Sequence, residues 1–266
     1  MTINLRRLKA IILLESDTHY SFPFAEIIVS LLVVLTFYFM SDSPYSIYYV
    51  VVSSPIWNGT VIEASIEQWI STHAFRTSAG ACYDMAFILA FLVPVLSALS
   101  FGRDLDTGIT KTLLSYPVTR HQLFISKEVI ILAITSGTVS VSYILALICF
   151  EPGPIQMEVV LLSLSSFWIP ALLVSSTTAL IGAKTKSLPA SLFGGIALSF
   201  GMIIIPTIVN QIPTMLIAIL NPGLVLVRYD FSSLMLESLL LGLITSLVIS
   251  ILMLLIAMKG FEKLEV

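Results

Sequence analysis

Charged residues are scarce in this chain, and their scarcity decides its class. Only 11% of the 266 residues are Asp, Glu, Lys or Arg, whereas 57% are apolar, and the mean hydropathy is +1.01. Soluble globular domains carry about 25% charged residues. The composition therefore excludes an ordinary soluble domain, and we expect membrane lipid around the chain and no nucleic-acid partner.

Cysteine and histidine are also rare. The three histidines, His19, His73 and His121, lie far apart, with no second Cys or His at the spacing of a metal site, so no metal is expected. Cys82 and Cys149 are predicted near the outer ends of two membrane spans. A disulfide between them and two separate thiols both remain open.

Motifs for chemistry are missing as well. No Gly-x-x-x-x-Gly-Lys-Ser/Thr string occurs, so the chain has no phosphate-binding loop with which to hydrolyse ATP. No Ser/His, Cys/His or paired-carboxylate arrangement indicates a membrane protease or lipid-processing enzyme. We expect no catalytic residue, no bound cofactor and no enzyme activity in this chain alone.

Long apolar runs are abundant. Six of them are long enough to cross a bilayer, which needs about 20 mostly apolar residues as a helix. The fold class is therefore predicted as all-α, a polytopic membrane protein with six transmembrane helices. The predicted spans are residues 22–40, 85–101, 129–150, 159–182, 190–210 and 238–258.

The cations predict the orientation of these spans, because Lys and Arg are retained on the cytoplasmic side. Eleven of the 13 cations fall before the first span, between spans two and three, between spans four and five, or after span six. Only Arg76 and Arg228 fall on the other side. We expect a multi-pass protein of the cytoplasmic (plasma) membrane with both termini in the cytoplasm.

The predicted spans contain almost no ionisable side chain. The exception is Glu26, one turn inside the first span, where it is either functional or reaches back to the inner interface. Ion-coupled carriers need ionisable groups or broken helices at midplane depth. An ion-coupled carrier is therefore a less favoured reading, and the spans indicate no proton relay.

Three regions flank the spans. Residues 1–21 are expected to form a basic amphipathic interface helix, or else a simple extension of the first span. The outer loop, residues 41–84, has apolar residues at helical spacing and predicts a short amphipathic helix that either rests on the outer leaflet or caps the transmembrane bundle. The outer segment 211–237 is apolar but interrupted by Asn221-Pro222-Gly223, which predicts short re-entrant or outer helices before span six.

The most informative feature is a polar island within the loop 102–128, between spans two and three. Asp104 and Asp106 precede Gly108 and can cap a short helix that Pro117 ends. Thr119 can cap the next helix, which runs into span three. These signals predict a short cytoplasmic helix joined rigidly to both spans.

The same residues resemble the signature region of type 2 ATP-binding-cassette (ABC) permeases. The family combines an acidic pair, a Gly-Thr-like turn, a Leu-Leu pair, a Pro-Val-Ser/Thr-Arg string and a later Gly-Lys. The matching positions here are Asp104, Asp106, Gly108, Thr110, Lys111, Leu113, Leu114, Pro117, Val118, Thr119, Arg120, Ser126 and Lys127. Ile109 separates the Gly from the Thr, and Ser126 stands where the family has Gly.

The resemblance implies a transmembrane permease subunit of an ABC exporter. It would dimerise with a second copy or a related permease, and its cytoplasmic coupling helix would dock a separate nucleotide-binding ATPase subunit that binds ATP and Mg. The alternative is a non-transporting membrane scaffold or assembly factor of similar architecture. No residue pattern identifies the exported substrate.

Overall fold

The computed structural model describes residues 12–13, 23–42, 66–108, 110, 119–150, 157–208, 214–228 and 236–263, and these residues form helices with no strand among them. The elements are α2 (Phe24–Asp42), α4 (Ile66–Ser97), η2 (Ala98–Gly102), α5 (Arg103–Asp106), α7 (Arg120–Leu132), η3 (Ala133–Gly137), α8 (Thr138–Phe150), α9 (Met157–Thr185), α10 (Leu188–Ile208), α11 (Thr214–Leu220), α12 (Gly223–Arg228) and α13 (Leu236–Glu262).

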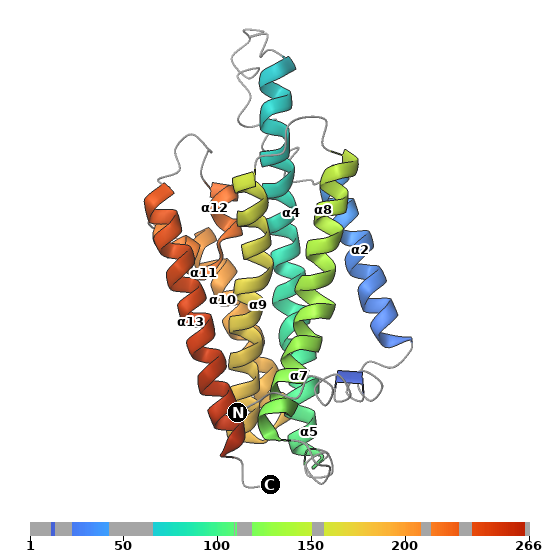
Figure 1. Ribbon diagram of the computed structural model, residues 1–266, viewed down its shortest axis with the longest axis vertical. Helices are drawn as coiled ribbons and strands as arrows, with labels where there is room; N and C mark the ends of the chain where they lie inside the picture. The colour runs from blue at the N-terminus through green and yellow to red at the C-terminus, as the bar shows by residue number, and fades with distance from the viewer. Residues whose placement is uncertain are drawn as a thin grey trace.

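Six of these helical segments are long and apolar enough to cross a membrane. Successive spans run in opposite directions, so α2 begins and α13 ends at the same end of the bundle (Figure 1). Helix α9 lies at the centre and packs against α4, α10 and α13, while α2 lies at one edge against α4 and α8. The arrangement is that of a multi-pass helical membrane protein.

Most of the described cations lie at one end of the bundle. Arg103, Arg120, Lys184, Lys186 and Lys259 lie where α5, α7, α9, α10 and α13 begin or end (Figure 1). We call this end the basic end. The opposite end carries Arg76 and Arg228, in α4 and α12.

Large apolar side chains cover much of the outer surface of the bundle. They are densest on α13, where the exposed residues are Leu240, Leu241, Ile244, Leu247, Val248, Ile249, Ile251, Leu252, Leu255 and Ile256. Soluble monomers rarely expose apolar patches larger than a few hundred Å². An apolar surface of this kind matches the hydrocarbon of a bilayer, in which lipid tails are as apolar as leucine.

Small residues and hydroxyls hold the helices together. A Cβ on Gly195 in α10 would lie 2.8 Å from Pro94 Cβ in α4, so only glycine allows this approach. η2 and α9 also lie close together, because a Cβ on Gly182 would be in ordinary van der Waals contact with the Gly102 Cα, at 3.4 Å. Such small-residue contacts are typical of helix packing in membranes, where no hydrophobic effect drives association.

Two spans contain a π-helical segment. η2 interrupts the second span just before α5, and η3 interrupts the third span just after α7. π-Helical turns are rare and occur often at functional sites. Here they flank the polar residues of the basic end.

The short helices α11 and α12 are joined at Asn221, where the sequence predicts a break. Their apolar side chains Ile217, Ala218, Leu224 and Val225 are buried, and the two helices pack against α13, α4 and α9. The pair therefore folds back into the bundle before the sixth span.

Several predicted boundaries need correction. The separate outer helix expected in residues 41–84 is instead the first part of α4, which runs unbroken from Ile66 to Ser97 and extends beyond its neighbours (Figure 1). No proline interrupts the chain between residue 66 and the predicted start of span two, so the helix continues. The third span begins at Arg120 rather than at residue 129.

The possible disulfide is not formed. Cys82 is a buried free thiol and Cys149 an exposed free thiol. Glu26 is exposed in the first turn of α2, which fits a side chain that reaches the interface. Apart from residues 12–13, the amino-terminal interface helix lies outside the described residues, as does the coupling helix with Lys111, Leu114 and Pro117.

Candidate functional site at the basic end

A buried ion pair joins the second and third spans. Lys127 Nζ donates to Asp104 Oδ2 at 2.5 Å and to the carbonyl oxygen of Ser100 at 2.9 Å. Both charged side chains are 1% exposed. Lys127 Nζ also lies 5.9 Å from the centre of the Phe101 ring, within the range of a cation–π contact. The two ends of the intervening loop are thereby fixed to each other.

The start of α7 places Lys127 in this position. Thr119 has extended backbone angles and caps the helix: its hydroxyl accepts from Gln122 N at 3.3 Å, while Gln122 Oε1 accepts from Thr119 N at 3.2 Å. This reciprocal capping box satisfies two backbone donors that a helix start otherwise leaves without partners. Lys127 follows two turns later, on the side that faces η2 and α5.

The last turn of α13 closes the site from the other side. Arg120 Nη1 donates to the carbonyl oxygen of Glu262 at 2.5 Å, and His121 Nε2 contacts the Glu262 carboxylate. Phe101, Phe124 and Phe261 form a buried triangle with ring centres 5.2 to 6.0 Å apart. Spans two, three and six are therefore packed as one unit at the basic end.

Glu128, one residue after Lys127, is a site residue that sequence reasoning missed. Its side chain is buried and points to α9, where Ser175 Oγ lies 2.7 Å from Oε2. The mean hydropathy placed Glu128 just outside the third span, because Lys127 and Glu128 lower the mean hydropathy of the residues around them. The signal that could have found it is the Thr119 cap, from which helix α7 continues without a break into the apolar run.

The sequence-predicted residues divide into three groups. Asp104, Lys127 and Thr110 are buried, and the first two are brought together. Asp106 is exposed, and Gly108 has a φ of +76° with open space within 4 Å of where a Cβ would lie, so its role is the turn itself. Arg120 contacts α13.

Polar atoms without hydrogen-bond partners also gather in this half of the bundle. Within the part of the chain that the structure describes, the buried hydroxyls of Ser97, Ser100, Thr110 and Ser176 have none, nor has Glu128 Oε1. Buried polar groups are normally paired, so such a concentration needs an explanation. We call these five residues, together with Asp104 and Lys127, the polar centre.

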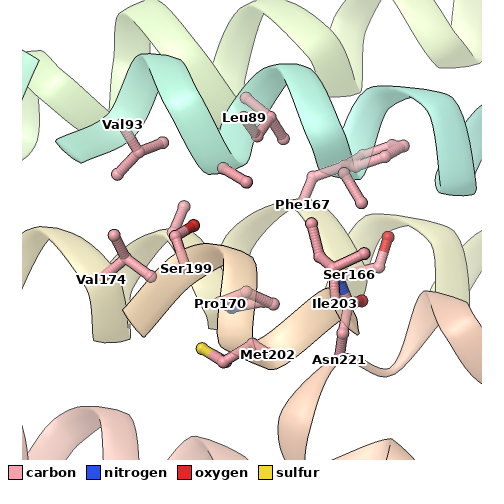
Figure 2. A pocket seen from close by; sticks show the side chains of 13 residues that line it. Leu89, Val93, Ser166, Phe167, Pro170, Val174, Ser199, Met202, Ile203 and Asn221 are labelled. Atoms are coloured by element: carbon pink, nitrogen blue, oxygen red, sulfur yellow. The ribbon is translucent and has the colours of Figure 1, made fainter. Parts of the chain in front are cut away.

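A small cavity lies deeper in the bundle, between α4, α9 and α10 (Figure 2). Its volume is about 20 Å³, enough for one water molecule. Apolar side chains dominate its lining, with three polar residues among them, Ser166, Ser199 and Asn221. Asn221 is fixed at the break between α11 and α12, where its Oδ1 accepts from Gly223 N at 3.1 Å.

A hydroxyl cluster ties the opposite half of the bundle together. The Tyr143 hydroxyl lies 2.7 Å from Ser78 Oγ and 3.0 Å from Ser163 Oγ, which joins α8 to α4 and α9. All three side chains are buried. These bonds fix the positions of the three helices relative to one another.

No protein-family model matches this chain, and no curated protein matches it. Across the described residues, no group of three or more His, Cys, Asp and Glu side chains is placed to hold a metal ion.

Proposed function

We propose that this chain is the transmembrane permease subunit of an ABC exporter. It couples ATP hydrolysis by a separate nucleotide-binding subunit to the export of a substrate across the cytoplasmic membrane. The observation that carries the proposal is the buried Asp104–Lys127 pair, which joins the two ends of the loop that resembles the ABC permease signature.

The pair gives that loop a mechanical function. A force on residues between Asp106 and Thr119 reaches spans two and three together. The inner ends of these spans are joined by the Asp104–Lys127 ion pair and by the hydrogen bond from Lys127 to the Ser100 carbonyl. The same force reaches span six through the contacts of Arg120 with the last turn of α13. One docking event at the loop therefore acts on three of the six spans.

The proposal assigns partners and orientation. The basic end faces the cytoplasm, where the ATPase subunit binds ATP and Mg and docks on the loop. A second copy of the chain, or a related permease, completes the substrate path between two subunits. The exposed apolar faces of α2 and α13 are available to lipid or to that second copy.

Co-purification tests the proposal. We expect the chain, extracted from its native membrane in mild detergent, to carry a P-loop ATPase with it. Arg120→Ala and Asp106→Asn should lower the ATPase activity of the complex; Asp106 is exposed, so its loss leaves the fold intact. Lys184→Ala, an exposed cation at the same end, is the matched control and should change little.

Two results would contradict the proposal. If no ATPase accompanies the chain, a membrane scaffold or assembly factor becomes the better reading. If an ATPase accompanies it but Asp106→Asn and Arg120→Ala leave its activity at the level of the control, the loop does not transmit force.

A further inference from the structure

Three buried ionisable side chains lie at the basic end, and two of them, Lys127 and Glu128, are adjacent in sequence. As whole residues Asp104 is 0% exposed, Lys127 is 1% and Glu128 is 3%. Among the residues whose burial the structure describes, no other Asp, Glu, Lys, Arg or His is buried. Two of the three are acids and one is a base. With every group in its usual ionised form, the cluster would carry one uncompensated negative charge.

Lys127, the single cation of the three, is already paired with Asp104. Lys127 Nζ contacts Asp104 Oδ2 at 2.5 Å and the Ser100 carbonyl oxygen at 2.9 Å. Glu128 has one hydrogen-bonded oxygen, Oε2, and Oε1 has no hydrogen-bond partner. The uncompensated charge would therefore reside on Glu128.

Among the residues that the structure describes, the other charged groups near α7 lie at the solvent-facing end of the elements around it. Three of these groups are half-buried: Arg120 and His121 in α7, and Glu262 in α13. The others are exposed and lie on α5, α9 and α13: Arg103, Asp106, Lys184 and Lys259. None is enclosed with Glu128. An ionised carboxylate without a paired cation is strongly disfavoured inside a protein or a membrane.

The hydrogen bonds around Ser175 give an independent indication. Its Oγ lies 2.7 Å from Glu128 Oε2 and 3.2 Å from the carbonyl oxygen of Leu172. A hydroxyl has one proton to donate, and a carboxylate and a carbonyl can only accept. With an ionised Glu128 the two acceptors must share the one Ser175 proton. Each contact has a proton of its own only if Glu128 carries one on Oε2 and donates it to Ser175, which then donates to Leu172.

We propose that Glu128 holds a proton in this conformation and that Asp104, Lys127 and Glu128 form an enclosed, electrically neutral one-proton site between α5, α7 and α9. Movement of α7 away from α9 would admit water to the carboxyl, and a hydrated glutamic acid is ionised at neutral pH. The site therefore links the α7–α9 contact to the uptake and release of one proton. It does not require the permease proposal, since it uses this chain alone.

Infrared spectroscopy of the purified full-length chain in lipid tests the proposal directly. At neutral pH we expect the C=O absorption of a protonated carboxylic acid, which shifts in D₂O. Glu128→Gln should abolish it, whereas Glu158→Gln, an exposed acid in the first turn of α9, should retain it. Absence of the absorption from the unmodified chain, or its persistence in Glu128→Gln, would overturn the proposal.

The pH dependence of stability gives a second measurement. Unfolding in water releases the proton, because an exposed glutamate is ionised at neutral pH, so a higher pH favours the unfolded chain. Between about pH 5 and about pH 8 the apparent melting temperature should fall by several degrees relative to Glu128→Gln. Glu158→Gln should follow the unmodified chain. Parallel curves for the unmodified chain and Glu128→Gln would show that no proton is held there.

Discussion

Removing one partner of the Asp104–Lys127 pair should destabilise the protein far more than removing both. Lys127→Met keeps most of the aliphatic stem and deletes only the ammonium group. It leaves Asp104, which is 0% exposed, without its cation at 2.5 Å. Breaking a buried pair in this way costs about 3–5 kcal/mol, because an uncompensated charge remains inside.

The double replacement separates charge from packing. Asp104→Leu should itself cost about 3–5 kcal/mol, since it leaves the buried Lys127 ammonium without its carboxylate. Asp104→Leu combined with Lys127→Met removes both charges and keeps a similar volume, and such exchanges are often neutral. We expect the double variant to lie within about 2 kcal/mol of the unmodified chain, well below the sum of the single costs.

Reversible unfolding in mixed detergent micelles, followed by circular dichroism, measures these free energies. Asp106→Asn and Lys259→Met are matched controls, because each removes an exposed charge at the same end, and each should cost less than about 0.5 kcal/mol. Additive costs in the double variant would refute the reasoning. So would single costs no larger than those of the controls, because the pair would then be hydrated.

Three further predictions concern packing and can be measured by the same unfolding assay. Gly195→Ala should destabilise by more than about 1 kcal/mol because its Cβ overlaps neighbouring helices, whereas Gly201→Ala in the same helix meets nothing within 4 Å and should be neutral or stabilising. Phe261→Ala should cost about 3–5 kcal/mol by emptying the aromatic triangle, whereas Phe193→Ala, 70% exposed, should cost less than about 1 kcal/mol. Tyr143→Phe should cost about 1–2 kcal/mol, since two buried hydroxyls lose a partner; no loss would show that these hydroxyls re-pair.

The existence and order of the six spans could be predicted because each is a long apolar run. The ends of spans two and three could not. Hydropathy treats Asp104, Lys127 and Glu128 as residues that belong in water, whereas the structure buries all three. Pairing between Asp104 and Lys127, 23 residues apart, offsets part of the cost of burying them, and an average over neighbouring residues contains no information about that contact.

The sequence identified individual residues of the polar centre but not the contacts between them. The sequence pointed to Asp104 and Lys127 as members of one loop, yet their contact depends on how η2 and α7 are turned. The role of Phe261 and Glu262 was invisible because they lie about 140 residues further along the chain. The Thr119 capping box, by contrast, is local, and the sequence placed that helix start correctly.

The attachment of α13 to the first turn of α7 has a consequence for biosynthesis. The sixth span is translated after the other five, so the Arg120 contact and the aromatic triangle cannot form until that helix has been inserted. Until then Phe101 and Phe124 lack their contacts with Phe261, and the inner ends of the second and third spans are not packed against the sixth. A nascent chain would thus expose incomplete packing to chaperones and proteases until the sixth span has been inserted.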